Sequence, residues 1–210
     1  MARDDFKRTE STSNSPPLTK NLRPIALFGT SADPPTYGHQ ALLEGLLSLF
    51  PRVITWASDN PMKHHGASLE KRHELLNALV KGINNTNLEL VQELSSPWTI
   101  STLKLANQFC PNSEFIFIIG SDLTGQIPNW YKAETLLKKL RIGIAPREGW
   151  PIQTQHLSKI ETLGGQVELL PLKIPSTASS EVRSNPRIDQ IPNAVLPILL
   201  EQNLYGLKHT

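Results

Sequence analysis

The feature of this 210-residue chain that most restricts its fold is an alternation between short apolar runs and longer segments with helical spacing. Residues 115–119 read Phe-Ile-Phe-Ile-Ile, which is apolar on both faces, as in a central strand of a parallel sheet. Helices between such strands form the crossover connections that parallel pairing requires. We therefore predict an α/β fold, a Rossmann-like doubly wound parallel sheet with flanking helices, in a single domain over residues 23–210.

The predicted elements follow one another along the chain in a strand–helix order. Strands are expected at residues 24–28, 53–56, 88–91, 115–119, 142–145 and 167–170. Helices are expected at 38–49, 68–81, 99–109, 132–139 and 152–162, with a short one near Ser180 and a last one at 192–202. In the helix at 99–109, we expect Ile100, Leu103 and Phe109 to face inward.

Residues 1–22 differ in composition from the rest of the chain, being polar, rich in Ser and Thr, and interrupted by Pro16-Pro17. We expect a disordered polar tail, because such a segment buries too little apolar surface to offset the entropy lost on ordering. No apolar run follows its early charges, and its acidic residues do not suit a transit peptide. We therefore expect neither kind of targeting segment here.

The net charge of +2 arises from the start of the chain. Five of the 21 Lys and Arg and three of the 19 Asp and Glu lie in residues 1–23, which leaves 16 of each in the remainder. A neutral body argues against a broad nucleic-acid-binding face. The apolar runs are too short to span a bilayer, and the single cysteine, Cys110, fits a reducing compartment. We expect a cytoplasmic protein with no membrane or nucleic-acid partner.

The first predicted strand leads into residues 29–39, Gly-Thr-Ser-Ala-Asp-Pro-Pro-Thr-Tyr-Gly-His, and then into a helix. Doubly wound folds bind ligands at the carboxyl end of the first strand, and a helix N-terminus offers free N–H groups to anions. Thr36 and His39 are one turn apart and are expected to share a face, while Gly38 leaves room for a ligand. The segment is neither a Walker A loop nor a G-x-G-x-x-G motif. The alternative is an ordinary strand-to-helix turn in which His39 caps or packs locally.

At these residues the chain resembles the nucleotidyltransferases with an (H/T)-x-G-H motif. It is most similar to the bacterial nicotinate mononucleotide adenylyltransferases, which open with G-G-T-F-D-P-P-H-x-G-H. The match keeps the first Gly, the Asp-Pro-Pro and the final Gly-His, and departs at Thr30, Ser31, Ala32 and Thr36. Further stretches resemble family motifs in the same order along the chain: Asn60-Pro61-Met62-Lys63 with Ser68 and Arg72, residues 97–103, Gly120-Ser121-Asp122 with Pro128-Asn129-Trp130, residues 178–183, and residues 191–206.

The resemblance implies adenylyl transfer from ATP to nicotinate mononucleotide, which gives deamido-NAD and pyrophosphate in NAD biosynthesis. It implies a set of catalytic residues, namely His39, Thr36 and Arg183. It implies contacts to ATP or its phosphates from Gly29, Thr30, Ser31, Gly38, Ser179 and Ser180, and contacts to the mononucleotide from Lys63, Arg72, Thr99, Asp122 and Trp130. Mg²⁺ would arrive on ATP. The histidines at 64, 65 and 73 are too poorly spaced to predict a metal site built by the protein.

Several alternatives stay open at this point. The acceptor could instead be nicotinamide mononucleotide or phosphopantetheine, although an enzyme for the latter should lack the Pro128-Asn129-Trp130 platform. The protein could also be a regulator that binds nucleotides but has lost catalysis, because it departs from the family pattern at Thr30, Met62 and Ala178. A nucleic-acid-binding module that uses the tail is a further alternative, and the oligomeric state is open, a homo-oligomer included. We expect nicotinate to be preferred, because residues 98–102 start a helix and carry no acid.

Overall fold

The six strands of the protein form one parallel sheet in a computed structural model that describes residues 23–207, so the predicted tail lies outside the described residues. Their order across the sheet is β3-β2-β1-β4-β5-β6, and every pair is parallel. The strands are β1 Ile25–Thr30, β2 Val53–Ala57, β3 Leu88–Leu90, β4 Phe115–Gly120, β5 Arg141–Ala145 and β6 Gln166–Leu169. The order reverses between β1 and β4, where doubly wound sheets open a crevice for ligands.

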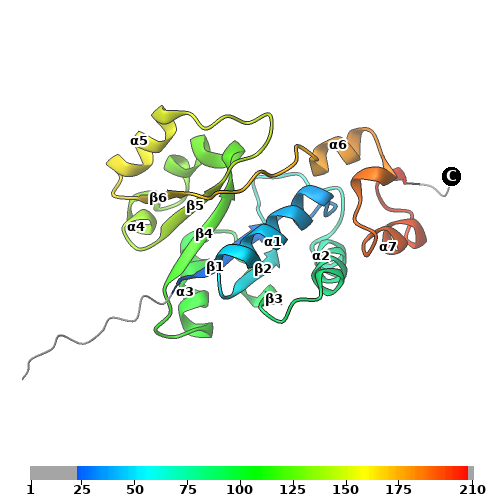
Figure 1. Ribbon diagram of the computed structural model, residues 1–210, viewed down its shortest axis with the longest axis horizontal. Helices are drawn as coiled ribbons and strands as arrows, with labels where there is room; N and C mark the ends of the chain where they lie inside the picture. The colour runs from blue at the N-terminus through cyan, green and yellow to red at the C-terminus, as the bar shows by residue number, and fades with distance from the viewer. Residues whose placement is uncertain (1–22, 208–210) are drawn as a thin grey trace, which may run out of the picture.

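Helices cover both faces of the sheet (Figure 1). The α-helices are α1 Tyr37–Leu49, α2 Leu69–Ile83, α3 Thr99–Phe109, α4 Ala133–Leu137, α5 Thr154–Thr162, α6 Ser179–Ser184 and α7 Leu196–Glu201. Short 3₁₀ helices are η1 Gln92–Leu94, η2 Ser121–Asn129, η3 Ile188–Gln190 and η4 Leu204–Gly206. One face packs against α1, α2, α6 and α7, and the other against α3, α4, α5 and η2.

The side chains of β1 contribute to the hydrophobic clusters on both faces of the sheet. Ala26 and Phe28 belong to the cluster with α1 and α2, whereas Ile25 and Leu27 belong to the cluster on the opposite face. Successive side chains of a strand point to opposite faces, so a strand buried on both sides must be apolar throughout. The predicted α/β fold, with its single parallel sheet, is confirmed.

Three local predictions differ from the structure. Phe109 does not face inward: its side chain is 48% exposed, and the Arg52 guanidinium lies 5.8 Å from the ring centroid. The last predicted helix is shorter than 192–202, because the chain turns at 193–195 before α7 begins at Leu196. The 3₁₀ helix η2 was not predicted, since Gly125 and Pro128 interrupt the helical pattern there. Among residues 23–207, no helix is both long and apolar enough to cross a membrane.

Candidate functional site

Thr36 and His39 meet at the start of α1, directly beyond the carboxyl end of β1. Thr36 is the N-cap, and its backbone N–H donates to Nδ1 of His39 at 3.1 Å, while its hydroxyl oxygen lies 3.0 Å from the same nitrogen. The two residues therefore share a face, as the spacing predicts. Because Nδ1 accepts the backbone N–H, the proton of the neutral ring is on Nε2, where it can be donated to a ligand.

The surroundings of His39 keep its ring neutral. Burial, together with the positive charges of Arg147 and Lys63, lowers the pKa of His39 from 6.5 to about 4. A cationic imidazole would also lose the Nδ1 lone pair that accepts the Thr36 N–H. At pH 7 the residue is thus a hydrogen-bond donor through Nε2 rather than a positive charge.

Gly38 allows a second segment of the chain to approach α1 closely. A Cβ atom at Gly38 would lie 2.9 Å from the hydroxyl and 3.0 Å from the carbonyl oxygen of Thr177. The Thr36 hydroxyl donates to this carbonyl at 3.1 Å. The sequence predicts space for a ligand beside Gly38, and the structure places Thr177 in that space instead. The space beside the Gly38 Cα is therefore taken by Thr177 and is not open to a ligand.

Arg147 connects the two sides of the crevice. It follows β5, and its Nη2 donates to the same Thr177 carbonyl at 3.1 Å, while its Nη1 lies 3.6 Å from Oδ2 of Asp122. A polar chain thus runs from Thr36 near β1 through Thr177 and Arg147 to Asp122 after β4. The sequence reasoning missed Arg147. Its position two residues beyond a predicted strand could have indicated it, because ligands bind at the carboxyl ends of such strands.

The remaining residues of the β1–α1 loop have internal contacts that shape it. Gly29 makes room for Trp56, because a Cβ atom there would lie 2.6 Å from the indole ring. The Thr30 hydroxyl accepts the N–H of Ala32 at 3.2 Å, and the Ser31 carbonyl accepts a hydrogen bond from Arg72. Gly29 can thus offer only backbone groups and the Thr30 hydroxyl is already engaged, whereas the Ser31 hydroxyl has no partner among the described residues.

Arg72 lies beneath this loop rather than in the crevice. Its side chain is 1% exposed, and it donates to the carbonyl oxygens of Ser31 at 2.8 Å, Ser58 at 2.7 Å and Ala67 at 3.2 Å. These bonds join the ends of β1 and β2 to the start of α2. The placement favours a positioning role over the mononucleotide contact predicted from the sequence. Lys63, by contrast, is exposed.

Thr99 and Trp130, two residues predicted to contact the mononucleotide, lie on neighbouring segments of the structure. Thr99 begins α3, and the N-cap residue Trp98 packs on Tyr131 with 4.9 Å between the ring centroids. This contact brings the start of α3 next to Trp130, whose ring meets Phe117 edge-on at 6.0 Å. Among the described residues, the Thr99 N–H has no acceptor, and the first turn of α3 has no acidic side chain. The start of α3 therefore offers a free N–H donor and no negative charge beside a cluster of aromatic rings.

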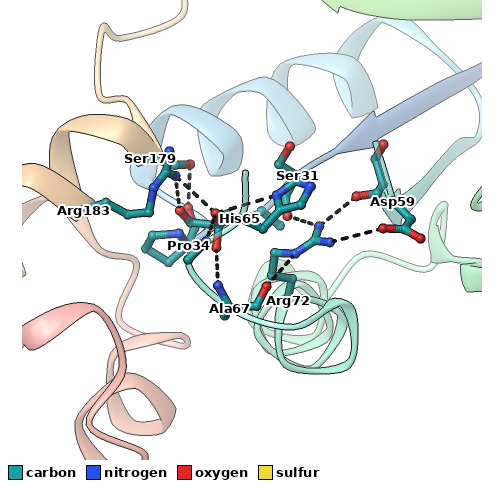
Figure 2. A network of polar contacts seen from close by, with 12 residues as sticks. Ser31, Pro34, Asp59, His65, Ala67, Arg72, Ser179 and Arg183 are labelled. Carbon is teal, nitrogen blue, oxygen red and sulfur yellow. Dashed lines mark hydrogen bonds and ion pairs between the residues drawn. The ribbon is translucent and has the colours of Figure 1, made fainter. Parts of the chain in front are cut away.

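Helix α6 folds back onto the Asp-Pro-Pro segment (Figure 2). The Ser179 hydroxyl donates to the Pro34 carbonyl at 2.7 Å, and Nη1 of Arg183 donates to the Asp33 carbonyl at 2.6 Å. Ser180 is exposed. The sequence reasoning also missed Asp33 as a site residue, although it quoted the motif that contains this buried carboxylate.

The comparisons with known proteins agree with this geometry. The cytidylyltransferase-like family model matches residues 27–185. A Synechocystis protein named "probable nicotinate-nucleotide adenylyltransferase" is 34% identical over 196 residues, which cover 86% of this chain and 98% of that protein. The nicotinate-nucleotide adenylyltransferase of Bacillus subtilis is 29% identical over 142 residues, covering 64% of this chain and 75% of that one.

A solved structure supports the fold. The nicotinic acid mononucleotide adenylyltransferase of Plasmodium falciparum, determined with NaAD, superposes with a TM-score of 0.71 at 23% identity, over 87% of this chain and 97% of that chain. The motif at the end of β1, the strand order and the Synechocystis relative, matched over 98% of its length, all agree. The chain belongs to the cytidylyltransferase-like family and, within it, to the nicotinate-nucleotide adenylyltransferases.

Proposed function

We propose that the protein transfers the adenylyl group of ATP to nicotinate mononucleotide, forming deamido-NAD and releasing pyrophosphate. A phosphate oxygen of the mononucleotide attacks the α-phosphorus of ATP, and the bond from that phosphorus to the bridging β-phosphate oxygen breaks. The nucleophile is already anionic near neutral pH, so the step needs no general base. The protein must therefore align two polyanions and stabilise the charge that develops on the leaving group.

The observation that carries this proposal is the neutral His39 at the N-terminus of α1. Its Nδ1 is occupied by Thr36, so its Nε2–H is the donor available to the α-phosphate. The first backbone N–H groups of this 13-residue helix favour an anion at the same place. Thr36 orients the ring, and Arg147 adds a fixed positive charge nearby.

The remaining contacts to ATP come from the loop after β1 and from α6. We assign backbone contacts to Gly29, Thr30, Ser31 and Gly38, whose internal bonds hold the loop in shape. Arg183 meets the β- and γ-phosphates, and the exposed Ser180 contacts the same phosphates. Ser179 assists by joining α6 to the loop through its bond to the Pro34 carbonyl. Mg²⁺ enters on ATP and is held chiefly by phosphate oxygens and water.

The mononucleotide is assigned to the corner between β4 and α3. Trp130 stacks on the pyridine ring, and the free N–H at Thr99 meets the carboxylate. Asp122, whose carboxylate is held near Arg147, accepts hydrogen bonds from the ribose hydroxyls. Lys63 faces the phosphate. Arg72 contributes by holding the β1–α1 loop, beneath which it lies. The cytoplasmic location of the protein stays a prediction.

The test is product formation with purified protein, ATP, Mg²⁺ and nicotinate mononucleotide. We expect deamido-NAD, identified by its mass, and an equal amount of pyrophosphate. Reactions with phosphopantetheine or without any acceptor are the controls. ATP binding without pyrophosphate release from any of these mixtures would contradict the proposal and favour a regulator that binds nucleotides.

A further inference from the structure

The buried carboxylate of Asp33 is the meeting point of segments that are distant in the sequence. Its side chain is 2% exposed. Oδ2 accepts the backbone N–H of Gly66 at 2.7 Å, and Oδ1 accepts the N–H of Ala67 at 3.1 Å. Oδ1 also accepts the hydroxyl of Tyr205 at 2.7 Å. The loop after β1 is thereby joined both to the loop before α2 and to the last described turn of the chain.

Arg183 is attached to the same residue. Its Nη1 donates to the backbone carbonyl of Asp33 at 2.6 Å and lies 3.4 Å from Oδ2. The Arg183 side chain is nevertheless 33% exposed. A guanidinium has five N–H donors, and those that Asp33 does not use can meet phosphate oxygens.

Gly66 provides a surface on which two side chains that contact Asp33 pack, those of Arg183 and Tyr205. A Cβ atom at Gly66 would lie 2.8 Å from Cδ of Arg183 and 2.9 Å from Cε1 of Tyr205. Such distances are too short for real contacts, so both side chains depend on the bare backbone there. Arg183 and Tyr205 therefore share one packing surface as well as one carboxylate.

Tyr205 has a backbone conformation that a tyrosine rarely adopts. Its φ is 56°, in the left-handed region, and this geometry directs the ring toward Asp33. Burial, followed by the hydrogen bond to Asp33, raises the pKa of Tyr205, so its hydroxyl stays protonated and remains a donor. Strained conformations persist where the surrounding contacts hold them, and these contacts end at the Asp33 carboxylate.

We propose that Asp33 and Tyr205 are positioning residues that hold Arg183 in the pose in which it meets the phosphates of ATP. The inference rests on the proposed function only in assigning Arg183 to ATP. Tyr205 acts through Arg183 and does not itself touch the nucleotide. Because Asp33 holds one edge of the guanidinium, less side-chain entropy is lost when ATP binds.

The test is a double-mutant cycle on ATP affinity, measured by calorimetry with Tyr205→Phe, Arg183→Ala and the double variant. The Tyr205 hydrogen bond is present with and without ATP, so only the part of its energy that depends on the pose of Arg183 enters the affinity. A bond to a charged group is worth about tenfold, and Tyr205→Phe should therefore weaken ATP binding by about threefold to tenfold. In the Arg183→Ala background, the same substitution should change affinity less than twofold. Ser184→Ala is the matched control, since it removes a hydroxyl bond to Glu181 in the same segment but leaves Asp33 alone.

A second variant covers the case in which Tyr205→Phe unfolds the C-terminal turn. Gly66→Ala pushes both Arg183 and Tyr205 away from residue 66, and its effect on ATP affinity should likewise disappear when Arg183 is alanine. Unchanged ATP affinity in Tyr205→Phe, or an equal loss with and without Arg183, would overturn the inference. The cycle measures binding alone, so failure of the wild type to form deamido-NAD would refute the proposed function without deciding this inference.

Discussion

Replacing Arg72 by alanine separates a positioning role from a ligand contact. The side chain is 1% exposed and donates to three carbonyl oxygens in three different segments. Arg72→Ala leaves three carbonyl oxygens without their donor, and a buried acceptor left unsatisfied costs about 1–3 kcal/mol. The three bonds share one guanidinium and are not additive, so we take the lower part of the sum, about 3–5 kcal/mol. In a domain of this size it corresponds to a fall in Tm of about 6–20 °C.

The assay is thermal unfolding of Arg72→Ala followed by circular dichroism, beside the neighbouring variant Lys71→Ala. Lys71 pairs with Glu74 at the surface, where both side chains are more than 40% exposed, so its loss should change stability by about 0.5 kcal/mol or less. Arg72→Lys should remain well below the wild type, because one ammonium cannot reproduce the planar fork. A Tm for Arg72→Ala within 2 °C of the wild type, combined with a raised KM for the mononucleotide, would refute the reasoning.

Four other outcomes follow from the site. His39→Ala should lower kcat by about a hundredfold, the scale for one lost transition-state donor, and turnover near that of the wild type would reject its role. An NMR titration of the His39 ring should have its midpoint near pH 4; because this pKa is below the ordinary 6.5, protonation favours the unfolded chain, and stability should fall as the pH decreases from 6.5 toward 4. A midpoint near 6.5 would contradict the burial argument. Trp130→Ala should raise KM for nicotinate and nicotinamide mononucleotides by the same factor, whereas an effect on one alone would show that the ring selects between them. Removal of residues 1–21 should leave turnover unchanged, because β1 begins at Ile25; a folded but inactive truncation would oppose this.

The sequence predicts most of the fold because the apolar runs of its strands are easy to separate from the helical spacing of apolar residues between them. The apolar run in β4 is short, β-branched and aromatic, which favours a strand buried on both faces, and the pattern in α1 and α2 leaves one apolar stripe for the core. The contact between Thr36 and His39 is also predictable, since it depends on one helical turn.

Long-range polar contacts could not be predicted in this way. Asp33 has its partners at Gly66, Ala67 and Tyr205, and nothing in the spacing of these residues indicates that they meet. Arg72 occupies a position that the resemblance assigns to the mononucleotide, and only the three loop carbonyls around it explain its burial. The roles of such residues can be recognised only in the folded structure, where the sheet brings the ends of separate strands together.

The most direct test of the proposed function is the ratio of kcat/KM for nicotinate mononucleotide and nicotinamide mononucleotide at fixed ATP. The start of α3 offers a free N–H at Thr99 and no acid in its first turn, which favours a carboxylate over a carboxamide. The N–H groups of Thr99 and Ile100 and the Thr99 hydroxyl have no acceptor among the described residues. Together these donors predict a ratio of about one hundred, at 1.4 kcal/mol for each factor of ten. A ratio of about one hundred in favour of the nicotinate substrate supports the assignment, and equal values for the two substrates would contradict it.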